Sequence, residues 1–140
     1  MLRKYVGFSL DKGRYAIPVD SVVQIIRYEQ ITAVPTAPAY VKGVMNMRGE
    51  VIPIITIRER FGLPDLEPTR KNRIIVISCQ NKSYGLLVDS VRELIELEEQ
   101  EIEEAATASL GLKAQLVHGI AKVGADLLLV LDIDQILASA

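Results

Sequence analysis

The chain repeats itself, and this internal likeness constrains the fold more than any other feature of the sequence. Residues 15–26 (Tyr-Ala-Ile-Pro-Val-Asp-Ser-Val-Val-Gln-Ile-Ile) resemble residues 84–95 (Tyr-Gly-Leu-Leu-Val-Asp-Ser-Val-Arg-Glu-Leu-Ile), 69 positions later. Residues 41–44 and 50–57 resemble residues 117–120 and 126–133, both at an offset of 76. The pattern indicates a duplicated unit, with copies at roughly 4–63 and 73–138 joined by the polar segment 64–72.

Short runs of Val, Ile and Leu, separated by turn residues, predict β-strands in both copies, about five in each. Residues 5–10 and 15–19 flank Asp-Lys-Gly, which is typical of a hairpin. Residues 51–57 and 73–79 are nearly continuous apolar runs, as expected of strands buried on both faces. Helical signals are weaker, and we expect only short helices at 57–63, at 105–116 and at the C-terminus over 132–138.

Size and composition point to one domain over residues 1–140. Of the 140 residues, 49% are hydrophobic and none is Trp, so the core must be aliphatic. A single copy of this size would have a marginal core, whereas two small curled sheets packed together share a core and bury their edges. We therefore predict a mainly β protein built from two pseudo-repeated subdomains, at about 4–63 and 73–138.

Several classes of function are disfavoured by the sequence. The net charge of −2 is a poor basis for binding nucleic acid. With one His and one Cys, and no glycine-rich phosphate loop or Gly-x-Ser-x-Gly turn, we expect no catalytic residue, no cofactor, no metal and no enzyme. The N-terminus lacks the apolar core of a signal peptide, and no apolar run approaches the roughly 20 residues of a membrane helix. We expect a cytoplasmic protein.

Differences between the copies separate residues that serve the fold from candidates for function. Asp20 and Asp89 are shared, as are Gly43 and Gly119, which are expected to allow a backbone conformation or a close approach that a Cβ would block. By contrast, the first copy has Asn-Met-Arg-Gly at 46–49 where the second has Lys-Val-Gly-Ala at 122–125. Two interpretations of Arg48 stay open: it caps backbone carbonyls or pairs with a carboxylate, or it anchors a partner protein.

At this point the motifs resemble a known family. Residues 43–58 (Gly-Val-Met-Asn-Met-Arg-Gly-Glu-Val-Ile-Pro-Ile-Ile-Thr-Ile-Arg) are similar to the signature of CheW-like chemotaxis coupling domains. So are Val-Pro at 34–35, Tyr-Val-Lys-Gly at 40–43, Gly-Leu-Leu-Val-Asp-Ser-Val at 85–91 and Leu-Asp-Ile-Asp at 131–134. These motifs occur in the family's order and cover almost the whole chain.

The resemblance implies a fold of two intertwined five-stranded β-barrels, whose termini are able to exchange between barrels. It implies a non-catalytic adaptor that binds the regulatory domain of a CheA-type histidine kinase and the cytoplasmic tip of methyl-accepting chemoreceptors, at membrane-bound receptor arrays and without inserting into the membrane. The kinase contact is expected on an apolar patch of the first barrel, and the receptor contact between the barrels. Matching positions place Val22, Gln24 and Gly43 near these surfaces, with Asn46 and Arg48 as the polar candidates.

Two alternatives remain. A CheW-like adaptor in a pilus-motility or other chemosensory pathway would have homologous partners and a different output. An unrelated small β-barrel that binds a ligand or nucleic acid would need a stacking platform or a basic groove. Five Tyr, two Phe and the acidic charge balance disfavour the second alternative.

Overall fold

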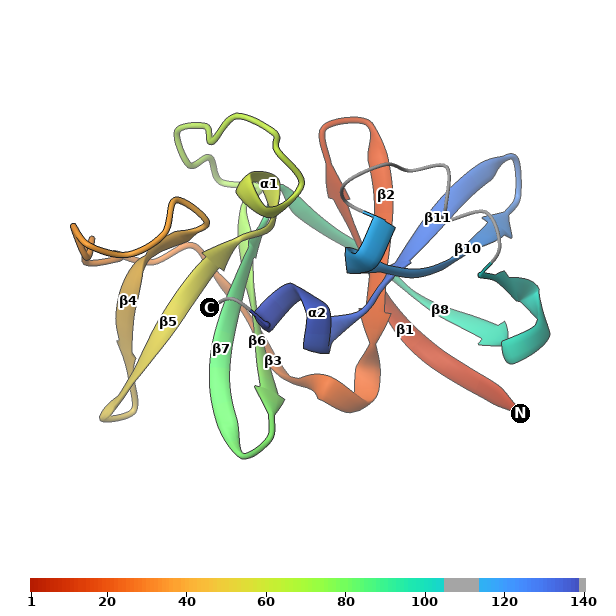
Figure 1. Cartoon of the computed structure of the whole chain (residues 1–140), viewed down its shortest axis with the longest axis horizontal. Helices are drawn as coiled ribbons and strands as arrows, with labels where there is room; N and C mark the ends of the chain where they lie inside the picture. Colours follow the sequence, from red (N-terminus) through yellow and green to blue (C-terminus); the bar gives the residue numbers. More distant parts are fainter. Residues whose placement is uncertain (105–113, 139–140) are drawn as a thin grey trace. The chain divides into compact units, whose positions relative to one another are not determined.

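The computed structural model describes residues 1–104 and 114–138, and the chain is mainly β, as predicted. The strands are β1 (Leu2–Leu10), β2 (Gly13–Pro18), β3 (Val22–Arg27), β4 (Val41–Met47), β5 (Glu50–Thr56), β6 (Arg73–Cys79), β7 (Lys82–Val88), β8 (Ser90–Glu98), β9 (Ile102–Glu103), β10 (Val117–Val123) and β11 (Asp126–Leu131). Short 3-10 turns, η1 (Val19–Ser21) and η2 (Glu99–Glu101), follow β2 and β8. Figure 1 shows these elements in sequence colours.

The helices are short. The predicted helices at 57–63 and at the C-terminus are confirmed as α1 (Ile57–Arg60) and α2 (Ile133–Leu137). The first turn of α2 is capped by Asp132, whose Oδ1 accepts a hydrogen bond from Gln135 N at 3.2 Å. Most of the predicted helix at 105–116 lies outside the described residues, and residues 114–116 form a 3-10 turn.

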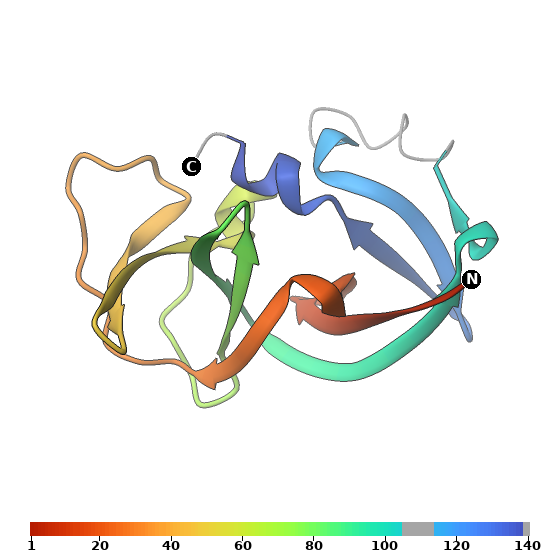
Figure 2. The same cartoon turned by 90° about the horizontal axis from the view of Figure 1, so that it is seen from below.

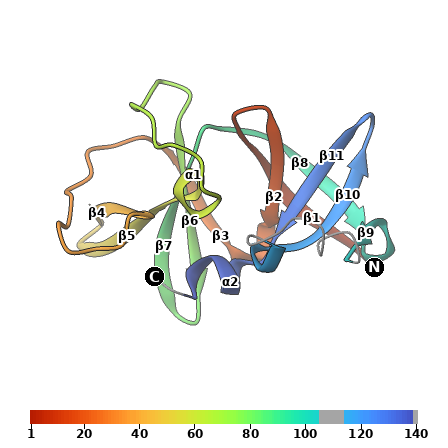
Figure 3. The same ribbon diagram turned by 45° about the horizontal axis from the view of Figure 1, so that its top comes forward.

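The strands form two sheets, which belong to two compact units. The first unit comprises residues 1–20 with the described part of 91–139, and its sheet has the order β8-β1-β2-β11-β10-β9. Figure 3 labels the strands of this sheet. The second unit comprises residues 21–90, and its sheet has the order β3-β6-β7-β5-β4. Each sheet therefore combines two strands from one sequence copy with the later strands of the other copy.

The pairing registers reproduce the sequence repeat. In the second sheet β5 pairs parallel with β7, so that Ile54 lies opposite Gly85. In the first sheet β11 pairs parallel with β2, so that Val130 lies opposite Ala16. These are equivalent positions under the two sequence offsets, and the copies therefore fold into equivalent sheets. The subdomain boundaries drawn from the sequence describe the copies, whereas each sheet is assembled from both.

The predicted closure into β-barrels is wrong for the part of the chain that the structure describes, where both sheets are open. In the second sheet the outer edge of β4 is occupied by Thr32, which exchanges two backbone hydrogen bonds of 2.9 Å with Val44. In the first sheet the two-residue strand β9 pairs with the equivalent edge of β10 and becomes a sixth strand. Short segments of the chain thus cover the edges that a closed barrel would have paired.

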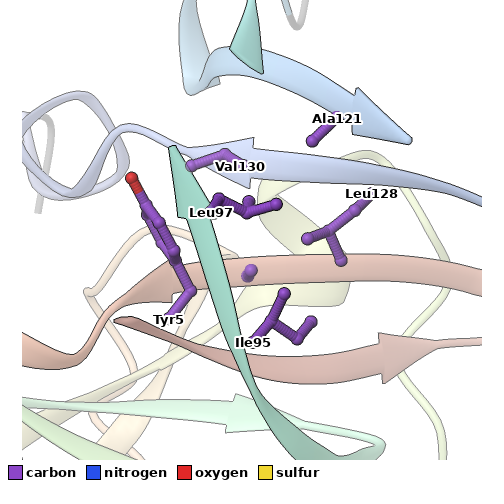
Figure 4. Close-up of a cluster of buried hydrophobic side chains, with 7 residues drawn as sticks. Tyr5, Ile95, Leu97, Ala121, Leu128 and Val130 are labelled. Atoms are coloured by element: carbon purple, nitrogen blue, oxygen red, sulfur yellow. The ribbon is translucent and has the colours of Figure 1, made fainter. Parts of the chain in front are cut away.

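Each unit has its own aliphatic core at equivalent positions of the repeat. In the first unit Leu128 and Val130 are buried with residues of β1 and β8 (Figure 4), and in the second unit Ile52 and Ile54 take their places. The clusters are Tyr5, Ala16, Ile95, Leu97, Ala121, Leu128 and Val130 in the first unit, and Met45, Ile52, Ile54, Ile74, Val76 and Leu87 in the second. Burying one such Leu or Ile side chain stabilises the fold by about 1.5–3 kcal/mol.

The hairpins β4–β5 and β10–β11 share a bulge that depends on glycine. The ladder shifts between Val41 and Gly43, and at the equivalent place between Val117 and Gly119. A Cβ added to Gly43 would lie 2.2 Å from the carbonyl oxygen of Thr32, and one added to Gly119 would lie 2.3 Å from Ile102 Cγ2. The expected close approach is confirmed at both glycines. Figure 2 shows that β5 curves along its length before the chain enters α1.

A buried ion pair fastens the ends of two adjacent strands in the second unit. Arg58 follows β5 and Asp89 follows β7, and Arg58 Nη1 donates to Asp89 Oδ2 at 2.7 Å. Arg58 Nε also donates to the carbonyl oxygen of Pro64 at 2.6 Å, which ties down the loop after α1. The side chain of Arg58 is only 8% exposed. In the other copy Asp134 stands at the position of Arg58, so the pair exists in one unit only.

The glycine bulge leads to a first prediction. Gly43→Ala should lower the free energy of unfolding by about 3 kcal/mol, because its Cβ collides with backbone, which cannot rotate away. Gly119→Ala is the matched control and should lower it by only about 1 kcal/mol, because its nearest neighbour is the Cγ2 methyl of Ile102, and a side chain can shift more easily than backbone. Urea denaturation followed by circular dichroism measures both values, and equal losses would contradict the steric explanation.

The buried ion pair leads to a second prediction. Arg58→Ala should lower the free energy of unfolding by about 2–3 kcal/mol, because it removes the partly buried ion pair with Asp89 and the hydrogen bond to the carbonyl oxygen of Pro64. The solvent that reaches Asp89 screens part of the loss. The exposed Arg48→Ala is the control and should change stability by less than about 0.5 kcal/mol. A double-mutant cycle with Asp89→Ala measures the coupling, and additive effects would show that the pair is not coupled.

Candidate docking surface

The β4–β5 hairpin ends in a two-residue turn that presents Arg48 to solvent. Met47 pairs with Glu50, and the turn residues Arg48 and Gly49 have φ angles of 54° and 84°. Positive φ at both central residues is the geometry of the tight turn that matches strand twist in a hairpin. Asn46 Oδ1 accepts a hydrogen bond from Gly49 N at 2.9 Å, so Asn46 holds the turn in place.

Arg48 has a left-handed backbone conformation, which is unfavourable for residues other than glycine. The left-handed region costs a non-glycine residue about 1–2 kcal/mol, and the equivalent residue of the other hairpin is Gly124, with φ of 62°. Among the described residues Arg48 has neither a carboxylate nor a carbonyl partner that would offset this cost. Among the described residues Arg48 is therefore neither an internal cap nor an ion-pair partner, and its role as an anchor for a partner protein stays a prediction.

An apolar strip runs along the hairpin behind Arg48. Val51 lies opposite Asn46, and Pro53 lies opposite Val44, so these four side chains share the outer face of the hairpin. Val51 is 64% exposed, while Val44 and Pro53 are half-buried. We call Asn46, Arg48 and Val51 the hairpin tip. It combines an exposed guanidinium with exposed aliphatic surface, which is a composition found at protein interfaces.

A second exposed apolar surface lies on β3, at the opposite end of the strand order. Val23 and Ile25 are 57% and 40% exposed, whereas Val22 and Gln24 on the alternate face are half-buried. Ile26 packs against the core of the second unit. We call Val23 and Ile25 the β3 strip.

The structure divides the site residues predicted from the sequence between two edges of one sheet. Val22 and Gln24 lie on β3, and Gly43, Asn46 and Arg48 lie on β4 and its turn, with β6, β7 and β5 between them in the sheet. Gly43 is buried at the bulge, so it shapes the hairpin and does not itself present a surface. Sequence reasoning missed Val23, Ile25 and Val51, although the two-residue alternation of β3 already separated its two faces.

Other kinds of site find little support among the described residues. No three His, Cys, Asp or Glu side chains in residues 1–104 and 114–138 are grouped so as to hold a metal ion. Within the same residues, no helix is both long and apolar enough to cross a bilayer.

Comparison with known proteins identifies the family of this chain. Residues 4–140 match the family model of the CheW-like domain. The chain is 31% identical over 134 residues to the chemotaxis protein CheW of Helicobacter pylori, covering 96% of this chain and 81% of that protein. It is 28% identical over 138 residues to CheW of Treponema pallidum, again covering 96% and 81%.

A solved structure extends the likeness to three dimensions. The crystal structure of the scaffolding protein TtCheW from Thermoanaerobacter tengcongensis superimposes with a TM-score of 0.85 at 30% sequence identity, covering 95% of this chain and 86% of that one. Because the family model spans nearly the whole chain and the two open sheets match those of a CheW structure, the chain belongs to the CheW-like family of chemotaxis scaffold proteins.

Proposed function

We propose that this protein is a non-catalytic adaptor that couples methyl-accepting chemoreceptors to a CheA-type histidine kinase. Membership of the CheW-like family supports a scaffolding role in chemotaxis. The observation that carries the coupling is the hairpin tip, where an exposed arginine without an internal partner is held in a costly backbone conformation beside an apolar strip. Such an arrangement gains free energy when a partner buries it.

Two docking surfaces within one unit suit an adaptor. The hairpin tip and the β3 strip lie at opposite ends of the same five-stranded sheet, so one protein can bind at either surface without occupying the other. Both surfaces are aliphatic with arginine alongside, Arg48 at the tip and Arg27 at the end of β3. We propose that one surface receives the regulatory domain of the kinase and the other contributes to the contact with the helical tip of the receptor, at membrane-bound arrays.

Weak individual contacts are sufficient for this role. Each surface is small, and a single contact of this kind gives modest affinity. In an array of receptors and kinases the second binding event becomes effectively intramolecular, which multiplies the affinities. The adaptor needs no reactive group for this function, only a rigid sheet that presents both surfaces.

The hairpin tip leads to a third prediction. Arg48→Glu should leave the fold intact and weaken binding of the kinase–receptor assembly by about tenfold or more, because the charge is reversed at an interface anchor. Receptor-stimulated autophosphorylation of the kinase in reconstituted receptor membranes measures the effect. Arg92→Glu, the same change at another exposed arginine, is the control. Full kinase stimulation with the Arg48→Glu variant would show that Arg48 is not part of the interface.

The separation of the surfaces leads to a fourth prediction. Val51→Glu and Val23→Glu should each impair capture of one partner and leave the other almost unchanged, because each change places a charge in a different apolar contact. Pull-downs with the isolated kinase regulatory domain and with receptor membranes distinguish the two. If both substitutions abolish the same contact, or if neither affects capture, the two-surface arrangement is wrong.

A further inference from the structure

A pocket in the second unit is lined by three arginines. It has a volume of about 530 Å³, and its lining residues are Arg27, Tyr28, Thr69, Arg70 and Arg73. We call it the arginine pocket. It is formed by the end of β3, the start of β6 and the loop that leads into β6, so segments distant in sequence meet there. Such a concentration of positive charge is unexpected on a chain whose net charge is −2.

The strand register forces two of the arginines together. Arg27 and Arg73 are directly opposite each other in the antiparallel β3–β6 pair. Like charges at such positions destabilise a sheet. Tyr28, the next residue, packs against the core of the second unit and fixes the chain after β3. The fold therefore keeps the Arg27 and Arg73 backbones adjacent although their charges repel.

The loop that carries Thr69 and Arg70 is held by its own hydrogen bonds. Thr69 N donates to Asn72 Oδ1, and Asn72 N donates to the carbonyl oxygen of Thr69 at 3.2 Å. Asn72 Nδ2 donates in turn to the carbonyl oxygen of Val88 at 3.1 Å, which fastens the loop to β7. The loop is thus ordered without any ligand, so little conformational entropy is lost when a ligand binds.

Arg73 is oriented by the same loop. Its Nη1 donates to the carbonyl oxygens of Arg70 at 2.7 Å and Asn72 at 2.8 Å. Among the described residues no partner is recorded for its Nε and Nη2, or for the guanidinium groups of Arg27 and Arg70. These donors remain for a ligand. A planar guanidinium offers them in a fork that matches the oxygens of phosphate or carboxylate.

Two largely buried arginines elsewhere in this chain have acidic partners. Arg14 contacts both Glu93 and Asp126, and Arg58 pairs with Asp89. None of the arginines in the pocket lies within 4.0 Å of a described carboxylate. The pocket is therefore the place in the second unit where clustered positive charge lacks a counter-charge.

We propose that the arginine pocket binds a phosphoryl group. A phosphoryl dianion carries more charge than a single carboxylate and presents three strong acceptor oxygens, which three guanidinium forks can share. The hydroxyl of Thr69 adds a further donor at the edge. The group can belong to a free phosphate compound or to a phosphorylated side chain of another protein. This proposal does not depend on the proposed coupling function.

The test titrates the full-length protein with sodium pyrophosphate and with a phosphoserine peptide, at constant ionic strength. Calorimetry gives the affinity, and amide NMR signals of Thr69 and Arg70 locate the binding. Arg27→Gln/Arg70→Gln removes two exposed charges and should weaken binding about tenfold or more. Arg92→Gln removes an exposed charge from the first unit and should leave the affinity unchanged.

The two probes separate the sources of the phosphoryl group. Tighter binding of pyrophosphate supports a free phosphate compound, and tighter binding of the peptide supports a phosphorylated protein. The proposal is overturned if neither probe binds, or if Arg27→Gln/Arg70→Gln binds as well as the Arg92 variant. It is also overturned if a glutamate peptide of the same charge binds equally well, because the pocket would then recognise charge alone.

Discussion

The parallel pairing of β5 with β7, and its counterpart between β11 and β2, holds each sheet together. In each case a strand from one sequence copy joins the hairpin of the other copy. Without this pairing, the β6–β7 hairpin would keep β3 but lose β5 and β4, and the core around Ile52 and Ile54 would be exposed. Two-stranded hairpins are marginal alone, so the exchange makes the fold cooperative.

The docking surfaces follow from the edges that this pairing leaves at each end of the second sheet. At one end β3 exposes Val23 and Ile25, and at the other the hairpin tip exposes Arg48 and Val51. The central strands β6 and β7 each bury four consecutive residues, Ile74–Ile77 and Gly85–Val88, so side-chain packing holds them firmly. The ion pair of Arg58 with Asp89 adds to this rigidity at the point where β5 and β7 end. Rigid presentation lowers the entropic cost of binding a partner.

Local sequence patterns predicted the strands, the hairpins and the equivalence of the copies because β-branched runs and turn residues act over a few positions. They did not predict that the sheets stay open, because Thr32 and β9 cover the edges through pairings distant in sequence. The alternation along β3 separates its two faces but does not reveal which one is exposed, since Val22 and Ile26 on one face are as apolar as Val23 and Ile25 on the other. The arginine pocket depends on the register that sets Arg27 opposite Arg73.

The division of the chain into one continuous and one interrupted unit has a consequence for synthesis. Residues 21–90 contain every strand of the second sheet, so this unit can be completed while the rest of the chain is still on the ribosome. The β1–β2 hairpin is translated before this unit but must wait for its sheet neighbours, because β8 and β11 are translated after residues 21–90. During that interval its apolar side chains, Phe8 and Ile17 among them, are the part of the nascent polypeptide most in need of chaperone protection.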